Sequence, residues 1–413
     1  MHPLKFFLLL LAFLSYGISA AQPQKTLVAS ITKDVNTSLY SITLNLHEHY
    51  VIDLASPFLW NVCPLQHKTV LCRSPECLKA QSYPPQSCVS VLQEQFSQVP
   101  CTCIVTPVNP ITKSCASAQL SYKNFSISSV SGTNPNGRLT FSQIYVSCAP
   151  RKLLQSLPEG VIGIAGLSNA TLALSYQFTP LNLGLSRKFA VCLPDTDASP
   201  GLLFFGDGPY NLMPPTSFDV ASILAYTPLL KVPKSPDYYI DVQAISIDGK
   251  AIPMTRKSLA VDRLGRGGVK LSTVVPYTTL RTGIYRSFIK SFKKATQGFP
   301  RVPAVTPFSL CYNATAIGFS RVGVHVPPID LQLANGKNWT IFGANSMKLI
   351  GEDVACLAFL NGGLMAEQAI VIGSFQMENN FLLFDLAKSR LGFSYTLFSI
   401  RTTCSDFNFA TIS

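Results

Sequence analysis

Short runs of apolar or alternating residues dominate the hydropathy pattern of this chain. They include LVASITK at 27–33, SLYSITLNL at 38–46, VGVHV at 322–326 and FLLFDL at 381–386. Such runs are typical of β-strands, and the 25 Gly and 29 Pro residues separate them at short intervals. The pattern predicts a mainly β protein with many short strands and few helices.

Two segments carry helical periodicity instead. In TGIYRSFIKSFKKAT, at 282–296, the apolar residues recur on one helical face and basic residues lie opposite. The apolar face consists of Ile284, Phe288, Ile289 and Phe292. A shorter helix is predicted near 173–178.

A weak internal duplication is visible in the order of the apolar segments. Each half has a turn that leads into an apolar run, VIDLASPFLW at 51–60 and VKLSTVVPYTTL at 269–280. Each half later has an apolar strand ending near Gly, GVIGIAG at 160–166 and AIVIGSF at 369–375. The repeated order predicts two similar lobes, joined in the Pro-rich segment 208–222.

The N-terminus has the organisation of a secretory signal. Lys5 precedes a short apolar core, and small residues follow up to Ala21. Residues 1–21 are therefore predicted to be a signal peptide, because the apolar core is too short for a membrane span. The mature chain then divides into an N-terminal lobe at 22–210 and a C-terminal lobe at 211–413.

Cysteines and sequons fit a secreted chain. An oxidising compartment favours disulfides, and the even number of 12 cysteines permits six, with the connectivity left open by the sequence. The cysteines are Cys63, Cys72, Cys77, Cys88, Cys101, Cys103, Cys115, Cys148, Cys192, Cys311, Cys356 and Cys404. Five sequons predict N-glycosylation at Asn36, Asn124, Asn169, Asn313 and Asn338. We expect no metal and no cofactor, since no His cluster accompanies the cysteines.

The formal net charge of +12 is spread along the chain. A diffuse basic surface is unlike the concentrated patch of a nucleic-acid-binding protein. An acidic polysaccharide or an acidic protein cleft is the better class of partner, unless the charge serves solubility alone.

The motifs together resemble the pepsin-like aspartic peptidase family over almost all of the mature chain. FAVCLPDTDASPGLLFFGDG, at 189–208, resembles the end of a first lobe, and AIVIGSFQMENNFLLFDLAKSRLGFS resembles the closing segment. Five further segments resemble a plant subgroup: extracellular dermal glycoproteins, basic 7S globulins and endoglucanase or xylanase inhibitors. These segments are VIDLAS at Asp53, KLSTVVPYTTL at 270–280, SRVGVHVP at 320–327, IDLQL at 329–333 and RTTCSDFNF at 401–409.

The resemblance implies a bilobal, mainly β, pepsin-like fold in a protein of the plant extracellular space or cell wall. It also implies one disulfide within the second lobe, between Cys311 and Cys356. A second disulfide, between Cys192 and Cys404, is implied to tie the C-terminal segment back across the lobes.

The same resemblance implies that peptidase chemistry is absent. Aspartic peptidases need two close carboxylates that share a proton. Asp53 occupies the first position, but Ser272 occupies the second, and a hydroxyl does not titrate in the range where such a pair works. Leu54 replaces the family's loop-bridging Thr, while Ala55 and Val274 replace Gly. Neither Ser272→Asp nor the unchanged chain is therefore expected to cleave protein.

Other catalytic interpretations are weaker. The flap Tyr-Gly motif is not recognisable, and Tyr122 in SYKNFS is a poor candidate for it. Asp262 could supply a second acid only if the family alignment were shifted. His47 and His49 could place two imidazoles on one face of a strand, although a solvated hairpin end is the simpler interpretation.

The plant subgroup is associated with proteins that block microbial glycoside hydrolases. Arg321 in FSRVGVHVP and Arg401 in SIRTTC match its inhibition-loop motifs. Arginine suits this role, because its guanidinium makes bidentate bonds to carboxylates such as the catalytic pair of a retaining glycosidase. The predicted partner is a secreted endoglucanase, most specifically a family-12 xyloglucanase, with xylanase the weaker choice.

Two alternatives stay open. A storage protein of basic 7S globulin type, or one that binds a small cysteine-rich peptide, would use the same fold without Arg321 or Arg401. The second alternative is a pseudoenzyme that coats acidic wall polysaccharide through its positive charge.

Overall fold

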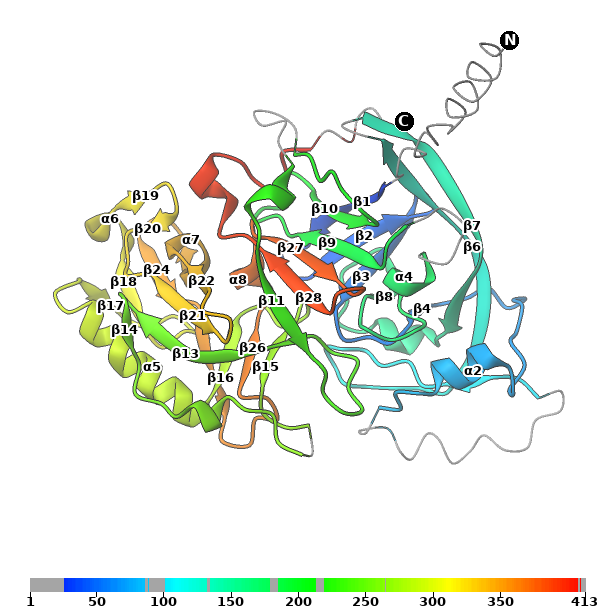
Figure 1. Ribbon diagram of the computed structural model, residues 1–413, viewed down its shortest axis with the longest axis horizontal. Helices are drawn as coiled ribbons and strands as arrows, with labels where there is room; N and C mark the ends of the chain where they lie inside the picture. Colours follow the sequence, from blue (N-terminus) through cyan, green and yellow to red (C-terminus); the bar gives the residue numbers. More distant parts are fainter. Residues whose placement is uncertain are drawn as a thin grey trace, which may run out of the picture.

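Two β-rich lobes lie side by side in the computed structural model (Figure 1). The structure describes residues 26–85, 88, 101–131, 134–178, 185–212, 219–263, 265–407 and 409. The signal peptide predicted at 1–21 lies outside the described residues. So does part of the join predicted at 208–222, and the lobe boundaries stay a prediction.

The N-terminal lobe contains ten strands among the described residues. They are β1 (Thr26–Lys33), β2 (Tyr40–Leu44), β3 (Glu48–Asp53), β4 (Leu59–Asn61), β5 (Ile104–Val105), β6 (Ala118–Ser131), β7 (Asn134–Cys148), β8 (Val161–Gly166), β9 (Lys188–Cys192) and β10 (Gly201–Phe205). Its helices are α2 (Pro75–Ala80), α4 (Leu174–Gln177) and the 3-10 turn η2 (Arg151–Leu154).

The C-terminal lobe contains the remaining strands. They are β11 (Ala225–Leu230), β12 (Tyr239–Ile240), β13 (Val242–Ile247), β14 (Lys250–Ala251), β15 (Val269–Leu271), β16 (Thr278–Arg281), β17 (Arg301–Val302), β18 (Cys311–Asn313), β19 (Phe319–Ser320), β20 (Gly323–Val324), β21 (Ile329–Leu333), β22 (Asn338–Ile341), β23 (Met347–Ile350), β24 (Val354–Leu357), β25 (Phe359–Gly363), β26 (Ile370–Ile372), β27 (Phe381–Asp385) and β28 (Arg390–Phe393). Its helices are α5 (Thr282–Ala295), α6 (Ala314–Ile317), α7 (Gly343–Ser346), α8 (Ser374–Met377) and the 3-10 turns η3 (Val220–Ile223), η4 (Arg256–Ser258) and η5 (Leu397–Ile400).

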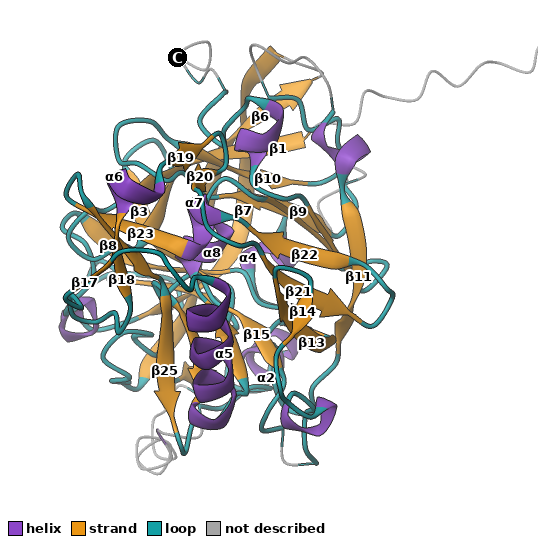
Figure 2. Cartoon of the chain, turned by 90° about the vertical axis from the view of Figure 1, so that its left-hand side faces the viewer, coloured by secondary structure: helices purple, strands orange, loops and turns teal. Residues whose placement is uncertain are grey.

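The helix predicted at 282–296 is confirmed as α5, which lies along the outside of the C-terminal lobe (Figure 2). Ile284, Phe288 and Phe292 are buried, and Ile289 packs against the same core. The short helix predicted near 173–178 is confirmed as α4. Burial of the predicted apolar stripe is what holds α5 to the sheet.

The strand predictions hold except for one. LVASITK, SLYSITLNL and FLLFDL form β1, β2 and β27. The strand predicted over VGVHV at 322–326 is confirmed only in part, because only Gly323–Val324 pairs, in a short hairpin with β19. Gly323 has φ 95°, so the chain turns there.

The predicted duplication appears as two β-units with the same pairing pattern. In the first, β3 runs parallel to β8, while β4 is antiparallel to β8 and parallel to β7. In the second, β15 runs parallel to β26, while β16 is antiparallel to β26 and parallel to β25. The turns that follow β3 and β15 are therefore brought to equivalent positions.

A sheet shared by both lobes joins them. Strand β9 of the N-terminal lobe pairs with β10 on one side and with β27 of the C-terminal lobe on the other. Phe189 on β9 stacks on Phe384 on β27, with ring centroids 4.5 Å apart. Lys33 adds a buried ion pair to Glu378 across the same boundary, at 2.7 Å. The lobes therefore form one continuous β-structure (Figure 1).

All 12 cysteines form disulfides, as the even count predicted. The pairs Cys311–Cys356 and Cys192–Cys404 are confirmed. The four remaining pairs, which the sequence left open, lie within the N-terminal lobe. They are Cys63–Cys148, Cys72–Cys101, Cys77–Cys103 and Cys88–Cys115.

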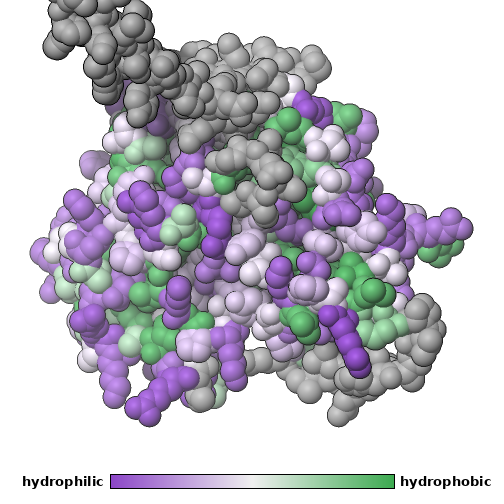
Figure 3. Space-filling view, turned by 45° about the vertical axis from the view of Figure 1, so that its right-hand side comes forward, coloured by the Kyte–Doolittle hydropathy of each residue, from purple (hydrophilic) through white to green (hydrophobic). Residues whose placement is uncertain are grey.

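The visible surface mixes hydrophilic and hydrophobic residues without a continuous band of either kind (Figure 3). Among the described residues, no helix has the length and apolar character needed to cross a membrane. Within the same residues, no group of three or more His, Cys, Asp or Glu side chains is arranged to hold a metal ion.

Candidate functional site

Asp53 ends β3 at the floor of a cleft between the two lobes. Residues of both lobes line this cleft of about 580 Å³, among them Asp53, Ser272 and Val274. Asp53 is only 4% exposed, and its Oδ1 accepts a hydrogen bond of 2.9 Å from the Ala55 N–H. Burial raises the pKa of Asp53, and the Ala55 hydrogen bond and the Lys270 ammonium offset only part of that effect.

Ser272 follows β15 and also faces this cleft. Its N–H donates to the carbonyl of Ile372 at 3.0 Å, and its Oγ accepts from the Val274 N–H at 3.4 Å. The turn after β15 thus presents a hydroxyl where the turn after β3 presents a carboxyl. A carboxyl in one turn and a hydroxyl in the other cannot divide the acid and base roles that two carboxyls sharing a proton have.

The neighbouring Thr273 ties the two turns together from one side. Its Oγ1 donates to the carbonyl of Ile52 at 2.8 Å and accepts from the Leu54 N–H at 3.4 Å. Leu54, in the other turn, is buried and carries no hydroxyl to return the contact. The sequence prediction named the loss at Leu54 but missed the bridging hydroxyl that Thr273 retains.

Charged groups line the rest of the cleft and partly neutralise one another. Lys270 forms an ion pair with Asp237. Burial alone would lower the pKa of Lys270, but the Asp237 carboxylate raises the pKa overall. Lys113 reaches the cleft from the other lobe, and burial lowers its pKa against the opposing field of Asp53. The cleft therefore has a mixed electrostatic character instead of a paired-acid centre.

Lys113 belongs to a hairpin over the cleft that the sequence prediction missed. Val108 and Cys115 bridge its two arms. Asn109 fixes its tip, since its Oδ1 accepts from the N–H groups of Ile111 and Thr112 at 2.7 and 3.0 Å. The dipeptide Asn109-Pro110 is a turn signal that could have indicated this element.

The weaker sequence candidates lie elsewhere. Tyr122 is on β6 and faces a groove on the N-terminal lobe instead of the cleft, so it is not a flap residue. Asp262 lies in a partly exposed turn, where it pairs with Arg266 at 3.1 Å. His49 contacts the Thr43 hydroxyl at 3.2 Å through Nδ1 and joins no metal-binding group among the described residues.

Arg321 and Arg401 are brought to neighbouring loops by the fold. Arg321 lies at the tip of the β19–β20 hairpin, and its Nη1 donates to the carbonyl of Ser399 at 3.5 Å. Ser399 is in η5, and Arg401 directly follows that turn. Both arginines are exposed. The red η5 turn and the yellow β19–β20 hairpin lie at the same end of the C-terminal lobe (Figure 1).

The loop that carries Arg401 is held at several points. Arg401 has φ 62° and ψ 36°, a left-handed conformation that closes η5. The Thr402 hydroxyl and the Thr403 N–H both donate to the Asp406 carboxylate at 2.8 Å. Cys404 is disulfide-bonded to Cys192. Such bracing lowers the entropy lost when a loop is ordered on binding.

Exposed aromatic rings accompany the two arginines. Phe319, on the Arg321 hairpin, is 56% exposed, and Tyr395, which precedes η5, is 43% exposed. Phe342 meets the Tyr395 ring edge-on, with centroids 6.3 Å apart. We call Phe319, Arg321, Phe342, Tyr395 and Arg401 together the arginine surface.

The predicted glycosylation sites differ in their surroundings. The Asn36, Asn124, Asn169 and Asn338 side chains are exposed. Asn313 is half-buried, and its Oδ1 caps α6 by accepting from the Ala316 N–H at 2.9 Å. Occupancy of all five sites stays a prediction.

The sequence and the structure are both similar to those of known proteins. The family model described as Xylanase inhibitor N-terminal matches residues 40–207, and the one described as Xylanase inhibitor C-terminal matches residues 237–395. A rice protein named Chitinase CLP is 39% identical over 401 residues, which cover 93% of this chain and 92% of that protein.

Two solved structures are similar over nearly the full length. The crystal structure of edgp superposes with a TM-score of 0.84 at 35% identity, covering 94% of this chain and 98% of that one. Conglutin gamma, a basic 7S globulin from lupine seeds, superposes with a TM-score of 0.77 at 29% identity, covering 94% and 100% of the two chains.

Proposed function

This chain belongs to the xylanase-inhibitor family of pepsin-like proteins, and from that premise we propose that it is a secreted, proteolytically inactive inhibitor of microbial glycoside hydrolases. The most specific form of the proposal is inhibition of a family-12 xyloglucan-specific endo-β-1,4-glucanase. The observation that carries it is the arginine surface, where two exposed guanidinium groups lie on neighbouring, braced loops.

The chemistry of the target supports this assignment. A retaining glycosidase keeps two carboxylates about 5 Å apart in an open cleft. A guanidinium caps such a pair through two parallel charge-assisted hydrogen bonds, which an ammonium cannot reproduce. Arginine and aromatic residues are also the side chains most enriched at binding hot spots. The net charge of +12 would further speed association with an acidic cleft.

The cleft supports the proposed inactivity as a peptidase. Asp53 and Ser272 line the same cleft, together with Lys113 and Lys270. In the turn after β15 the position equivalent to Asp53 is Ser272, and the Asp237 carboxylate in the same cleft is paired with Lys270. Both observations support the view that the cleft no longer divides acid and base roles between two aspartates.

The decisive experiment measures inhibition constants against a family-12 xyloglucanase. Replacing Arg321 or Arg401 by Ala removes one partner of a charge pair, which should weaken inhibition by about 2–5 kcal/mol, or roughly 30- to several-thousand-fold. Arg401→Lys should also weaken it, because the planar two-point contact is lost. Arg, Lys and Ala at position 401 all carry a similar cost for the left-handed backbone conformation. Differences in inhibition between these variants therefore report on the side chain.

Lys294→Ala is the matched control, because it removes one positive charge from the end of α5, outside the arginine surface. It should change the association rate and salt dependence without a large change in the inhibition constant. Equal inhibition by the wild type and all the variants would contradict the arginine mechanism. A panel with endoglucanases and xylanases tests the choice of target.

A storage or peptide-binding role is the second candidate. It is favoured by the similarity to a basic 7S globulin from lupine seeds and by the cleft of about 580 Å³ that remains between the lobes. Absence of inhibition across the whole glycosidase panel, together with capture of a small cysteine-rich peptide, would favour this role. Because the rice relative is named a chitinase, the purified protein should also be assayed alone on chitin oligosaccharides.

A further inference from the structure

The N-terminal lobe has a groove that the proposed function does not use. Its volume is about 690 Å³, and it runs between the segment 61–68 and the β6–β7 hairpin. The side chains that line it are mainly polar or amphipathic. They include Asn61, Gln66, His67, Lys68, Tyr122 and Gln143. A cavity of this size with convergent polar groups is suited to a small organic ligand.

A β-bulge directs the predicted glycosylation site Asn124 to this groove. Lys123 pairs with Ile144 and Phe125 pairs with Phe141, so Asn124 alone lies opposite Ser142 and Gln143. Gln143 has φ 60°, a conformation unusual for a non-glycine residue. Bulges re-aim side chains, and Asn124, Ser142 and Gln143 all line the groove.

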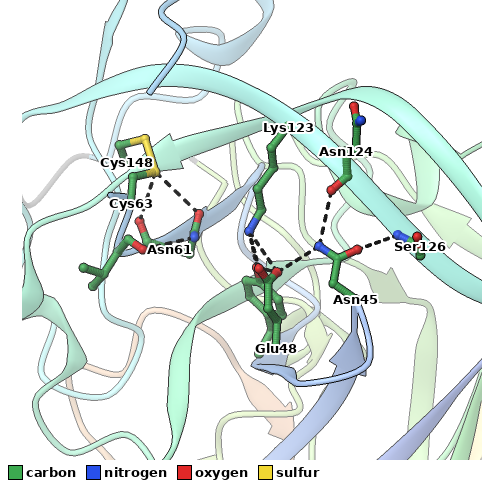
Figure 4. A network of polar contacts seen from close by, with 10 residues as sticks. Asn45, Glu48, Asn61, Cys63, Lys123, Asn124, Ser126 and Cys148 are labelled. Atoms are coloured by element: carbon green, nitrogen blue, oxygen red, sulfur yellow. Dashed lines mark hydrogen bonds and ion pairs between the residues drawn. A yellow bond between two sulfur atoms is a disulfide. The ribbon is translucent and has the colours of Figure 1, made fainter. Parts of the chain in front are cut away.

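The backbone around Asn124 is held firmly. The Asn45 side chain donates to the Asn124 carbonyl at 3.3 Å and accepts from the Ser126 N–H at 2.6 Å, so one amide braces both ends of the sequon. Asn45 in turn donates to Glu48 at 3.1 Å. Figure 4 shows this network, with the Asn124 side-chain amide pointing away from it. The side chain is exposed and open to modification.

The cations of the groove are largely engaged within the protein. Lys123 forms an ion pair with Glu48 at 2.8 Å. Lys68 lies over the Tyr122 ring, 5.3 Å from its centroid, and His67 contacts Gln119 at 2.8 Å. A neutral, hydroxyl-rich ligand therefore fits better than an acidic one, since amides and hydroxyls supply both donors and acceptors.

We propose that this groove is the seat of an N-linked glycan carried by Asn124, whose proximal N-acetylglucosamine units lie against Gln66, Lys68 and Tyr122. A glycan attached at the rim meets the groove at high effective concentration, so even weak contacts suffice. This inference rests on occupancy of the Asn124 sequon and is independent of glycosidase inhibition.

The test measures native deglycosylation of the full chain, produced in a secretory host that attaches uniform oligomannose glycans. An endoglycosidase that cuts between the two core N-acetylglucosamines is added, and release at each site is followed by glycopeptide mass spectrometry. The Asn124 glycan should be released about tenfold more slowly than those of the exposed Asn36 and Asn338, because cleavage requires undocking. After denaturation all sites should be cut at the same rate.

Variants of the groove make the test specific. Gln66 and Lys68 are exposed, so the double variant Gln66→Ala/Lys68→Ala should keep its melting temperature and lose the protection of Asn124. Lys79→Ala, an exposed lysine of α2 in the same lobe, should keep the protection. An unglycosylated Asn124, equal release at all sites in the native wild type, or protection that survives the double variant would each overturn the proposal.

Discussion

The two β-units that form the cleft share their strand order and differ in the turns they present. In both, the strand before the cleft turn runs parallel to an apolar partner, β8 or β26. The turn at the end of β3 begins Asp53-Leu54-Ala55, and the turn after β15 begins Ser272-Thr273-Val274. Strand pairing thus survives where the acidic residue does not, which teaches that the fold depends on the apolar pattern of the strands and not on the catalytic side chains.

The two turns also contribute different kinds of contact between the lobes. Thr273 supplies both hydrogen bonds that cross between them, whereas Leu54 supplies apolar packing. One hydroxyl is therefore enough to align the turns when the opposite side chain is buried. The comparison predicts that substitutions in the turn after β15 lower the stability of the protein more than substitutions in the turn after β3.

The largest expected effect comes from removing the disulfide that joins the two lobes. Cys192–Cys404 closes a loop of 212 residues between the lobes, whereas Cys311–Cys356 closes 45 residues within one. Replacing the first pair by Ala should lower the free energy of unfolding by about 5 kcal/mol, against about 4 for the second, from loop entropy alone. Urea unfolding measures both, and a larger loss for the Cys311–Cys356 pair would contradict this ordering.

Removal of the bridging hydroxyl should have an intermediate effect. Thr273→Val keeps the volume but leaves the Ile52 carbonyl and the Leu54 N–H without their partner, which typically costs about 1–3 kcal/mol. Thr273→Ser is the matched control, because it retains the hydroxyl. Denaturant unfolding should rank Val below Ser, and a Val variant as stable as Ser would show that the bridge contributes nothing.

The smallest effect concerns Asp53 and depends on pH. Because burial raises its pKa in the folded state, Asp53 holds its proton more tightly there than in the unfolded chain. Its contribution to stability is therefore complete below its ordinary value of 3.8 and is lost as pH rises through the raised pKa.

Asp53→Asn keeps an oxygen that can accept from the Ala55 N–H but cannot ionise. It should unfold with the same free energy as the wild type at low pH and become the more stable protein as pH rises above 3.8. Burial also raises the pKa of Glu378. Because Glu378 is present in both proteins, its contribution cancels in the difference between their free energies of unfolding. A stability difference that does not change with pH would refute this assignment.

Much of the fold could be predicted because it rests on local patterns. The apolar stripe of α5 and the alternation in β1 and β2 are visible in the sequence, and the family resemblance supplied the pairing of Cys192 with Cys404. The strand over VGVHV is shorter than predicted because Gly323 turns the chain, an effect of one residue that hydropathy does not record.

The candidate site was predicted less completely, because its contacts join distant residues. Asp53 and Ser272 were found through the resemblance to the pepsin-like family, and both line the cleft. Lys113 was missed, since its position depends on a hairpin that Asn109 fixes through side-chain hydrogen bonds. The closeness of Arg321 to the loop of Arg401 is likewise a tertiary result that no sequence spacing encodes.

The sheet shared by the lobes has a consequence for synthesis on the ribosome. One edge of β9 pairs with β27, which is synthesised much later. Cys192, at the end of β9, can form its disulfide only after Cys404, 212 residues further along the chain, has been synthesised. At about 5–20 residues per second, that delay is roughly 10–40 s. During this time the N-terminal lobe presents an unpaired apolar edge, the kind of template on which chains aggregate. Slowed or interrupted translation of the second half should therefore lower the yield of soluble protein.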